Sequence, residues 1–412
     1  IIMGKPFRIK NLEGFFFYIV LFINGFIVIS LHPMQTTYQH NLWRLYILKI
    51  SHWFMLVMPI VVLFYQNNGL SIKEVFILQS IYSLSIVLLE IPSGYFADAL
   101  GRKNTLIAGA ILGFAGYATY SFTSGFIGFM VAEIILGFGQ SMISGADSAL
   151  LYDSLLDDGK QDDYLKHEGR MTSVGNFAEA AAGIIGGLLA ALSLRYPYYG
   201  QTFIAFLAIP SAITLIEPKI NQNRVDLNWK QIVGIVRYSL IDNVELRWNI
   251  IYSSIVGAST LTMAWFVQPW LIRADIKVES FGIIWTGLNL IVGLAAMYAY
   301  KAEIKFGRKP LVIALSVALG LGFVLVGIIP QLWALSLFII FYIARGIATP
   351  ILKDGINRLA PSNMRATILS VRNFTIRIIF SIWGPFYGWL TDKLSLTHAL
   401  VIAGIIFIVL AI

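Results

Sequence analysis

The stretch Gly94-Tyr95-Phe96-Ala97-Asp98-Ala99-Leu100-Gly101-Arg102-Lys103 separates two long apolar segments of the chain. Ionised side chains are costly in the hydrocarbon core of a bilayer, by at least about 2.5–3.5 kcal/mol each on insertion scales. We therefore expect this charged, glycine-punctuated stretch to lie at a membrane–water boundary, where it joins two helices that cross the membrane.

The composition indicates a polytopic membrane protein. The 412 residues are 58% hydrophobic, 14% aromatic and 13% charged, with a mean hydropathy of +0.75, whereas ordinary globular chains are about 25% charged. The net charge of +8 resides in Lys and Arg of short loops, which the positive-inside rule explains without a nucleic-acid partner. The chain has no Cys, which excludes disulfides and thiolate metal sites, and its five His show no metal-ligand spacing.

We expect twelve spanning helices, because each needs about 20 apolar residues. Their ranges are 46–66, 74–98, 104–122, 125–150, 170–193, 199–216, 248–272, 279–300, 310–328, 332–352, 366–389 and 394–412. Basic loops such as 101–103 and 301–309 alternate with loops poor in Lys and Arg such as 66–71 and 274–280. The basic loops should face the cytoplasm, which predicts a multi-pass protein of the bacterial inner membrane.

Five residues of the opening stretch form the pattern G-x-x-x-D-x-x-G-R-[KR]: Gly94, Asp98, Gly101, Arg102 and Lys103. This pattern resembles the loop between transmembrane helices 2 and 3 of the major facilitator superfamily of transporters, of the bacterial 12-helix type. The resemblance implies an all-α integral membrane protein of two pseudo-symmetric six-helix bundles that works by alternating access. We expect the acid and the basic residues to form a conformational latch, made in one state and released in the other.

Internal repetition supports two halves. Gly101-Arg102-Lys103 recurs as Gly307-Arg308-Lys309, and Val174-x-Asn176-Phe177 recurs as Val371-x-Asn373-Phe374. Copies in the same order, roughly 200 residues apart, indicate duplicated bundles. We place the N-terminal bundle at 46–216 and the C-terminal bundle at 248–412, joined by a cytoplasmic linker at 217–247 that contains an amphipathic helix.

The second copy of the loop is degraded. Ile304 stands where the first copy has Asp98, and Glu303 comes one residue early. We therefore expect an asymmetric latch, with a firmly placed acid in the first half alone.

Residues 1–45 form an extension whose apolar part, 14–31, is just long enough to span. A span there would put Arg44 and Lys49 outside, against the other basic loops. We expect an interfacial helix, or sequence upstream of the natural protein; a thirteenth span is the alternative. The chain begins Ile1-Ile2-Met3 and stops inside an apolar run, so we expect a fragment whose last helix is truncated.

Five ionisable residues lie well inside the expected spans, where such groups usually mark substrate pathways or proton relays. We assign to substrate or proton handling Glu90, Glu133, Glu179, Arg345 and Arg377. Glu179 and Arg377 have similar depths in their spans, and we expect them to face each other across the internal two-fold axis. Structural pairing between helices is the alternative for all five.

Two motifs depart from the resembled family. Glu133 stands where many proton-coupled exporters have arginine, so it offers a carboxyl group instead of a coupling cation. Ala182-Gly183-Ile184-Ile185-Gly186-Gly187 resembles the exporter motif G-P-x-x-G-G but lacks its Gly-Pro, which weakens the case for drug export. Trp265, Trp285 and Trp383 are expected to line a cavity that suits an apolar or amphiphilic substrate.

The expected function is secondary transport of a small molecule, driven by the proton gradient and without a cofactor. Export of amphiphilic compounds is the first hypothesis, and proton-coupled uptake of a small organic anion is the second. A lipid flippase or a non-transporting membrane partner is the third. An enzyme is not expected, because the chain lacks G-x-S-x-G, H-E-x-x-H and a P-loop. We expect a monomer whose partners are its substrate and the lipid bilayer.

Overall fold

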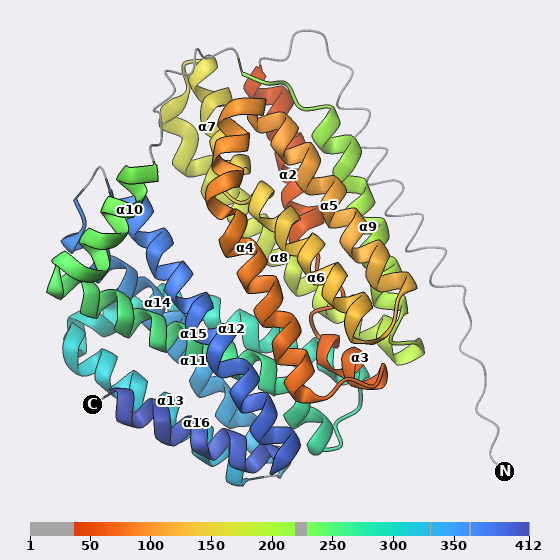
Figure 1. Ribbon diagram of the computed structural model, residues 1–412, viewed down its shortest axis with the longest axis vertical. Helices are drawn as coiled ribbons and strands as arrows, with labels where there is room; N and C mark the ends of the chain where they lie inside the picture. The colour runs from red at the N-terminus through yellow and green to blue at the C-terminus, as the bar shows by residue number, and fades with distance from the viewer. Residues whose placement is uncertain (1–36, 219–228, 330, 362–363, 412) are drawn as a thin grey trace.

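The helices gather into two groups that meet along a central seam (Figure 1). The computed structural model describes residues 37–218, 229–329, 331–361 and 364–411. Residues 1–36 of the expected extension at 1–45 lie outside these residues, and so do residues 219–228 of the expected linker at 217–247.

The first group is formed by the N-terminal half. Its helices are α2 (Thr37–Trp53), α3 (Val61–Asn67), α4 (Ile72–Leu100), α5 (Arg102–Phe122), α6 (Gly125–Ile143), α7 (Ala146–Asp157), α8 (Tyr164–Leu192) and α9 (Tyr196–Ile213). A capping box begins α4, because Ser71 accepts from the Glu74 backbone while the Glu74 carboxylate accepts from the Ser71 backbone. Gly101 separates α4 from α5 at a positive φ of 91°, which only glycine adopts freely.

The second group is formed by the C-terminal half. Its helices are α10 (Trp229–Arg237), α11 (Val244–Arg273), α12 (Glu279–Phe306), α13 (Arg308–Ile328), α14 (Phe338–Leu359), α15 (Arg365–Lys393) and α16 (Leu396–Ala411). A π-helical turn at Tyr238–Asp242 follows α10. The expected all-α membrane fold is confirmed, and eight helices of the described residues are long and apolar enough to cross a membrane.

Two expected spans are broken rather than continuous. The span at 46–66 is divided between α2 and α3, and the span at 125–150 is divided at Gly145, whose φ is +81°. The first break contains Pro59, which lacks a backbone donor. Side chains distant in the sequence bind the backbone groups of this break. Gln201 accepts from the Leu56 N–H at 2.8 Å, and Gln268 of the other half donates to the Met58 carbonyl at 2.8 Å. Sequence pattern alone does not reveal such long-range partners.

The two halves are packed together at one end of the molecule. We call this the outer end, and we call the end with Arg102 and Arg308 the cytoplasmic end, following the distribution of basic loops. At the outer end Gly187 of α8 lies against Gly282 of α12, and Gly388 of α15 lies against the backbone of Ile72 and Lys73. One hydrophobic core joins both halves there.

The cytoplasmic ends are arranged differently. Each half has its own small core there, around Leu150 in the first half and around Ile356 in the second. The ion pairs of the described residues each join groups within one half. A molecule that is closed at the outer end and divided at the cytoplasmic end is in an inward-facing conformation.

Candidate functional site

A cavity of about 520 Å³ lies between the two halves. Both halves contribute to its wall, through α4 and α8 on one side and α11, α12, α14 and α15 on the other. Its size falls within the range of about 300–1,000 Å³ that is usual for small-molecule sites. The cavity therefore has the position and the volume of a substrate site.

Three of the five predicted charges line this central cavity. They are Glu179 of α8, Arg345 of α14 and Arg377 of α15. Glu179 and Arg377 thus line the same cavity, and their expected facing arrangement stays a prediction. Arg345 lies close enough to Glu179 to attract it electrostatically, and Arg377 lies close to the Tyr82 hydroxyl. The cavity thus combines two cationic groups with one acidic group.

Aromatic rings form much of the remaining wall. Trp265 and Trp285 line the cavity as expected from the sequence, together with Trp53. Trp285 is only 8% exposed, and its buried indole N–H has no hydrogen-bond partner among the described residues. A donor of this kind can bind an acceptor group of a ligand.

Trp383 does not line the central cavity. Its ring packs instead against Phe407 of α16 and Tyr387, with centroids 5.4 and 6.3 Å apart. The sequence placed Trp383 on a cavity-facing helix, but the ring lies on the face of α15 that contacts α16. Trp383 belongs to the core of the C-terminal half.

Glu133 lies in a second cavity, mostly inside the N-terminal bundle, which adjoins the central cavity at shared lining residues such as Gln79, Tyr82 and Trp265. The Glu133 side chain is 5% exposed, and one carboxylate oxygen, Oε1, accepts from the Tyr65 hydroxyl at 2.7 Å and from Gln79 Nε2 at 2.6 Å. The Tyr65 hydroxyl also lies 2.5 Å from that of Tyr120. This cavity has a volume of about 230 Å³ and reaches Lys49 and Asp147 nearer the cytoplasmic end.

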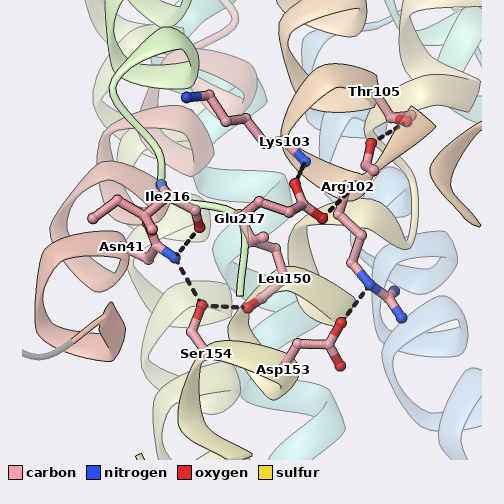
Figure 2. A network of polar contacts seen from close by, with 10 residues as sticks. Asn41, Arg102, Lys103, Thr105, Leu150, Asp153, Ser154, Ile216 and Glu217 are labelled. Carbon is pink, nitrogen blue, oxygen red and sulfur yellow. Dashed lines mark hydrogen bonds and ion pairs between the residues drawn. The ribbon is translucent and has the colours of Figure 1, made fainter. Parts of the chain in front are cut away.

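The residues of the predicted latch in the first half have partners that the sequence did not suggest. The Glu217 carboxylate accepts from the backbone N–H groups of Arg102 and Lys103 at 2.9 and 2.8 Å, and so caps the start of α5 (Figure 2). The Arg102 side chain pairs with Asp153 of α7 at 2.6 Å. The described contacts therefore join α5 to α7 and to the chain after α9, all within one half.

Three of the predicted residues lie in a part of α4 where only the backbone is described. The helix continues through Glu90, Gly94 and Asp98 up to Leu100, and the side chains of 90–100 lie outside the description. The expected role of Asp98 in the latch stays a prediction.

The matching turn of the second half has ion pairs with its own acids. Gly307 turns the chain at a φ of +77°, and Arg308 then donates to Glu303 at 2.7 Å and pairs with Asp354 of α14. Arg358 also donates to Asp354, at 2.7 Å, whereas Lys309 is exposed. The sequence register pointed to Ile304 at the acidic position, but Glu303 in the last turn of α12 still reaches across the turn. The acid is therefore not confined to the first half.

Sequence reasoning missed the polar residues that connect the halves at the outer end. Gln268 of α11 accepts from the Val62 N–H at 2.8 Å. The Asp392 carboxylate of α15 accepts from Ile72 and Lys73 N–H at 3.0 and 2.8 Å, at the start of α4. A glutamine directly before Pro269 in an apolar helix was the available signal for the first of these contacts.

Comparison with known proteins gives consistent results. A family model described as the Major Facilitator Superfamily matches residues 45–384. The quinolone resistance protein NorA of Staphylococcus aureus (strain MSSA476) is 25% identical over 202 residues, which are 46% of this chain and 51% of NorA. The chain thus matches only about half the length of this relative. The uncharacterized MFS-type transporter YxaM of Bacillus subtilis (strain 168) is 20% identical over 361 residues, 85% of this chain and 89% of YxaM.

Solved structures share the fold. A mutant of the nucleoside transporter NupG superposes with a TM-score of 0.78 at 16% identity, over 90% of this chain and 97% of that one. Identity at this level establishes the common fold alone.

Proposed function

The chain belongs to the Major Facilitator Superfamily of transporters, and from that premise we propose that it exports amphiphilic compounds across the bacterial inner membrane in exchange for protons. The observation that carries this proposal is the central cavity of about 520 Å³, lined by both halves. Rocking of the two halves would expose such a cavity to each side of the membrane in turn.

The lining supports an amphiphilic substrate. Trp265, Trp285 and Trp53 offer apolar surface to an aromatic or aliphatic body. Arg345 and Arg377 offer charge-assisted hydrogen bonds to an acidic group, and Glu179 offers the same to an amine. The partial similarity to a quinolone resistance protein agrees with a substrate that combines these features.

Uptake of a small organic anion is the second candidate, favoured by the excess of arginine over acid in the cavity. The two functions differ in direction. Cells that express the chain should survive toxic amphiphiles better than cells without it and should accumulate less of a fluorescent one. Unchanged survival, together with faster entry of a labelled organic acid, would instead establish uptake.

Proteoliposomes test the coupling directly. Transport of a protective compound should accelerate when a pH gradient is imposed in the direction that drives exchange. A rate that is indifferent to the pH gradient would contradict coupling to protons while leaving the transporter function in place.

A further inference from the structure

The Glu133 carboxyl is buried without a cationic partner among the described residues. Its two donors, Tyr65 on α3 and Gln79 on α4, are neutral groups. The other titratable side chains that face it are also tyrosines: Tyr82 on α4, Tyr117 and Tyr120 on α5, and Tyr198 on α9. Burial of an ionised carboxylate without a cation is costly, so a proton is the simplest counter-charge that this environment can accept.

The cavity around Glu133 is too narrow for a drug-sized molecule. Its volume is about 230 Å³, and along α6 and α7 the path from Glu133 to Asp147 covers about 20 Å at a rise of 1.5 Å per residue. A space of this volume and length suits a chain of water molecules with polar partners. Such partners are present in the wall, where His52 and Gln140 lie between Glu133 and the Lys49–Asp147 ion pair.

Aromatic rings close this cavity toward the outer end. Phe64 packs against Tyr198 and Phe129 with centroids 4.0 and 5.4 Å apart. The Arg195 guanidinium lies over the Phe64 ring at 5.5 Å. In this conformation the cavity around Glu133 extends toward the cytoplasmic end, and aromatic rings lie between Glu133 and the outer end.

A short mechanical connection links Glu133 to the opposite half. Tyr65, which donates to Glu133, lies on α3 one turn after Val62, whose backbone N–H is bound by Gln268 of α11. The break before α3 allows this seven-residue helix to move separately from α2. When the halves separate at the outer end, the contact with Gln268 must break, and the position of Tyr65 relative to Glu133 can then change.

We propose that Glu133 is the proton-carrying group of this transporter, that it exchanges its proton with the cytoplasm through the cavity of the N-terminal bundle, and that α3 couples its protonation to the contact with Gln268. This inference rests on the proposed function. In the proton step a hydronium ion transfers H⁺ to the carboxylate and becomes water. The neutral carboxyl then donates one hydrogen bond, and the Tyr65 hydroxyl, which donated to the carboxylate, turns toward Tyr120.

A first experiment needs no substrate, so it separates this proposal from the proposed function. Because the chain has no Cys, a Thr172→Cys/Ile304→Cys pair places two spin labels at exposed positions on the cytoplasmic parts of α8 and α12. The distance between the labels in lipid nanodiscs should change between mildly acidic and mildly alkaline pH. The Glu133→Gln substitution should abolish this pH dependence. The variant should elute like the wild-type protein on size-exclusion chromatography, which shows that it is folded.

Glu179→Gln is the matched control, because it removes a carboxylate from the central cavity instead. It should preserve the pH dependence of the label distance while weakening ligand binding. A wild-type distance that does not respond to pH, or a Glu133→Gln protein that responds as wild type does, would overturn the proposal.

A second experiment tests the route. Gly113 lines the inner cavity, and a Cβ at this position would meet no atom within 4 Å. Gly113→Leu should place apolar atoms in the cavity and slow proton uptake, followed with a pH-sensitive dye after a pH jump, by an order of magnitude. Gly287→Leu, at an open position on α12 outside this cavity, should leave the rate unchanged. Equal rates in the wild type and Gly113→Leu would refute the route.

Discussion

Gly282 of α12 lies so close to Gly183 of α8 that a Cβ at position 282 would come within 2.1 Å of the Gly183 carbonyl oxygen. The contact joins the two halves at the outer end, next to the Gly187–Gly282 contact. Absence of a side chain is what allows the two backbones to approach. Part of the sequence that resembles an exporter motif, Gly183 to Gly187, thus closes the outer end in this conformation.

Gly282→Ala should therefore favour the outward-facing conformation. Overpacking typically costs about 1–3 kcal/mol, and here the cost falls on the inward-facing state alone, since the contact is absent when the halves separate. The label pair at Thr172 and Ile304 should report a shorter cytoplasmic distance. Gly287→Ala, on the same helix with open space around it, is the control. Identical distances in both variants would show that this contact does not set the balance.

Asp392 should stabilise the same closed outer end by a different interaction. Its carboxylate caps the start of α4 across the boundary between the halves, where the helix dipole favours negative charge by about 0.3–1 kcal/mol. Asp392→Ala also removes two hydrogen bonds and should shift the label distance in the same direction as Gly282→Ala. Glu279→Ala removes an exposed acid in the first turn of α12 and should have no effect. A shift in both variants would point to general charge loss rather than to the cap.

The Gly183–Gly282 contact and the Asp392 cap of α4 are features that the sequence did not predict. The spans follow from apolar run lengths, and repetition of Gly-Arg-Lys identified the two turns at Gly101 and Gly307. Ends of α8, α12 and α14 lie six or seven residues from the expected positions, and two expected spans are broken. Glu179, Arg345 and Arg377 could be selected from the sequence because a charge at bilayer depth is conspicuous in any window, and all three line the central cavity. Which of the two arginines lies nearer to Glu179 depends on how the helices are rotated about their own axes, and the sequence pattern does not give that rotation.

Neutral and end-located polar groups were harder to recognise. Gln79 and Gln268 are unremarkable in an apolar helix until their long-range partners are known. Glu217 seemed to begin a linker, but its carboxylate caps a helix that starts far away in the sequence. Trp383 was wrongly predicted to line the cavity for the same reason, because its contacts depend on the three-dimensional packing. One face of α15 contacts α16 and the other faces the opposite half, and the sequence does not show on which face Trp383 lies.

Glu217 and Gly101 should contribute jointly to stability. A Cβ at position 101 would lie 3.1 Å from the Glu217 carboxyl carbon, and the φ of Gly101 is +91°. Glu217→Gln should lower the free energy of unfolding by about 1 kcal/mol through loss of a charged cap. Gly101→Ala should cost more, because a positive φ strains alanine and the methyl group crowds the carboxylate.

Gly69→Ala separates these two costs. Gly69 also has a positive φ, of 86°, but a Cβ there would meet no atom within 4 Å. Thermal unfolding in detergent should rank Gly101→Ala as less stable than Gly69→Ala. Equal melting temperatures would mean that Glu217 moves aside without cost.

Arg345 should determine the affinity for acidic substrates. It lines the central cavity beside Glu179, and a hydrogen bond to a charged group contributes about 1.5–3 kcal/mol. Arg345→Ala should therefore weaken binding of an acidic amphiphile by about ten- to a hundredfold, measured by ligand-dependent thermal shift. Trp265→Ala removes apolar surface, so it should weaken acidic and neutral amphiphiles alike. Lys277→Ala, an exposed cation at the outer end, is the control for net charge. If Arg345→Ala weakened neutral and acidic compounds equally, the arginine would shape the cavity rather than bind the acid.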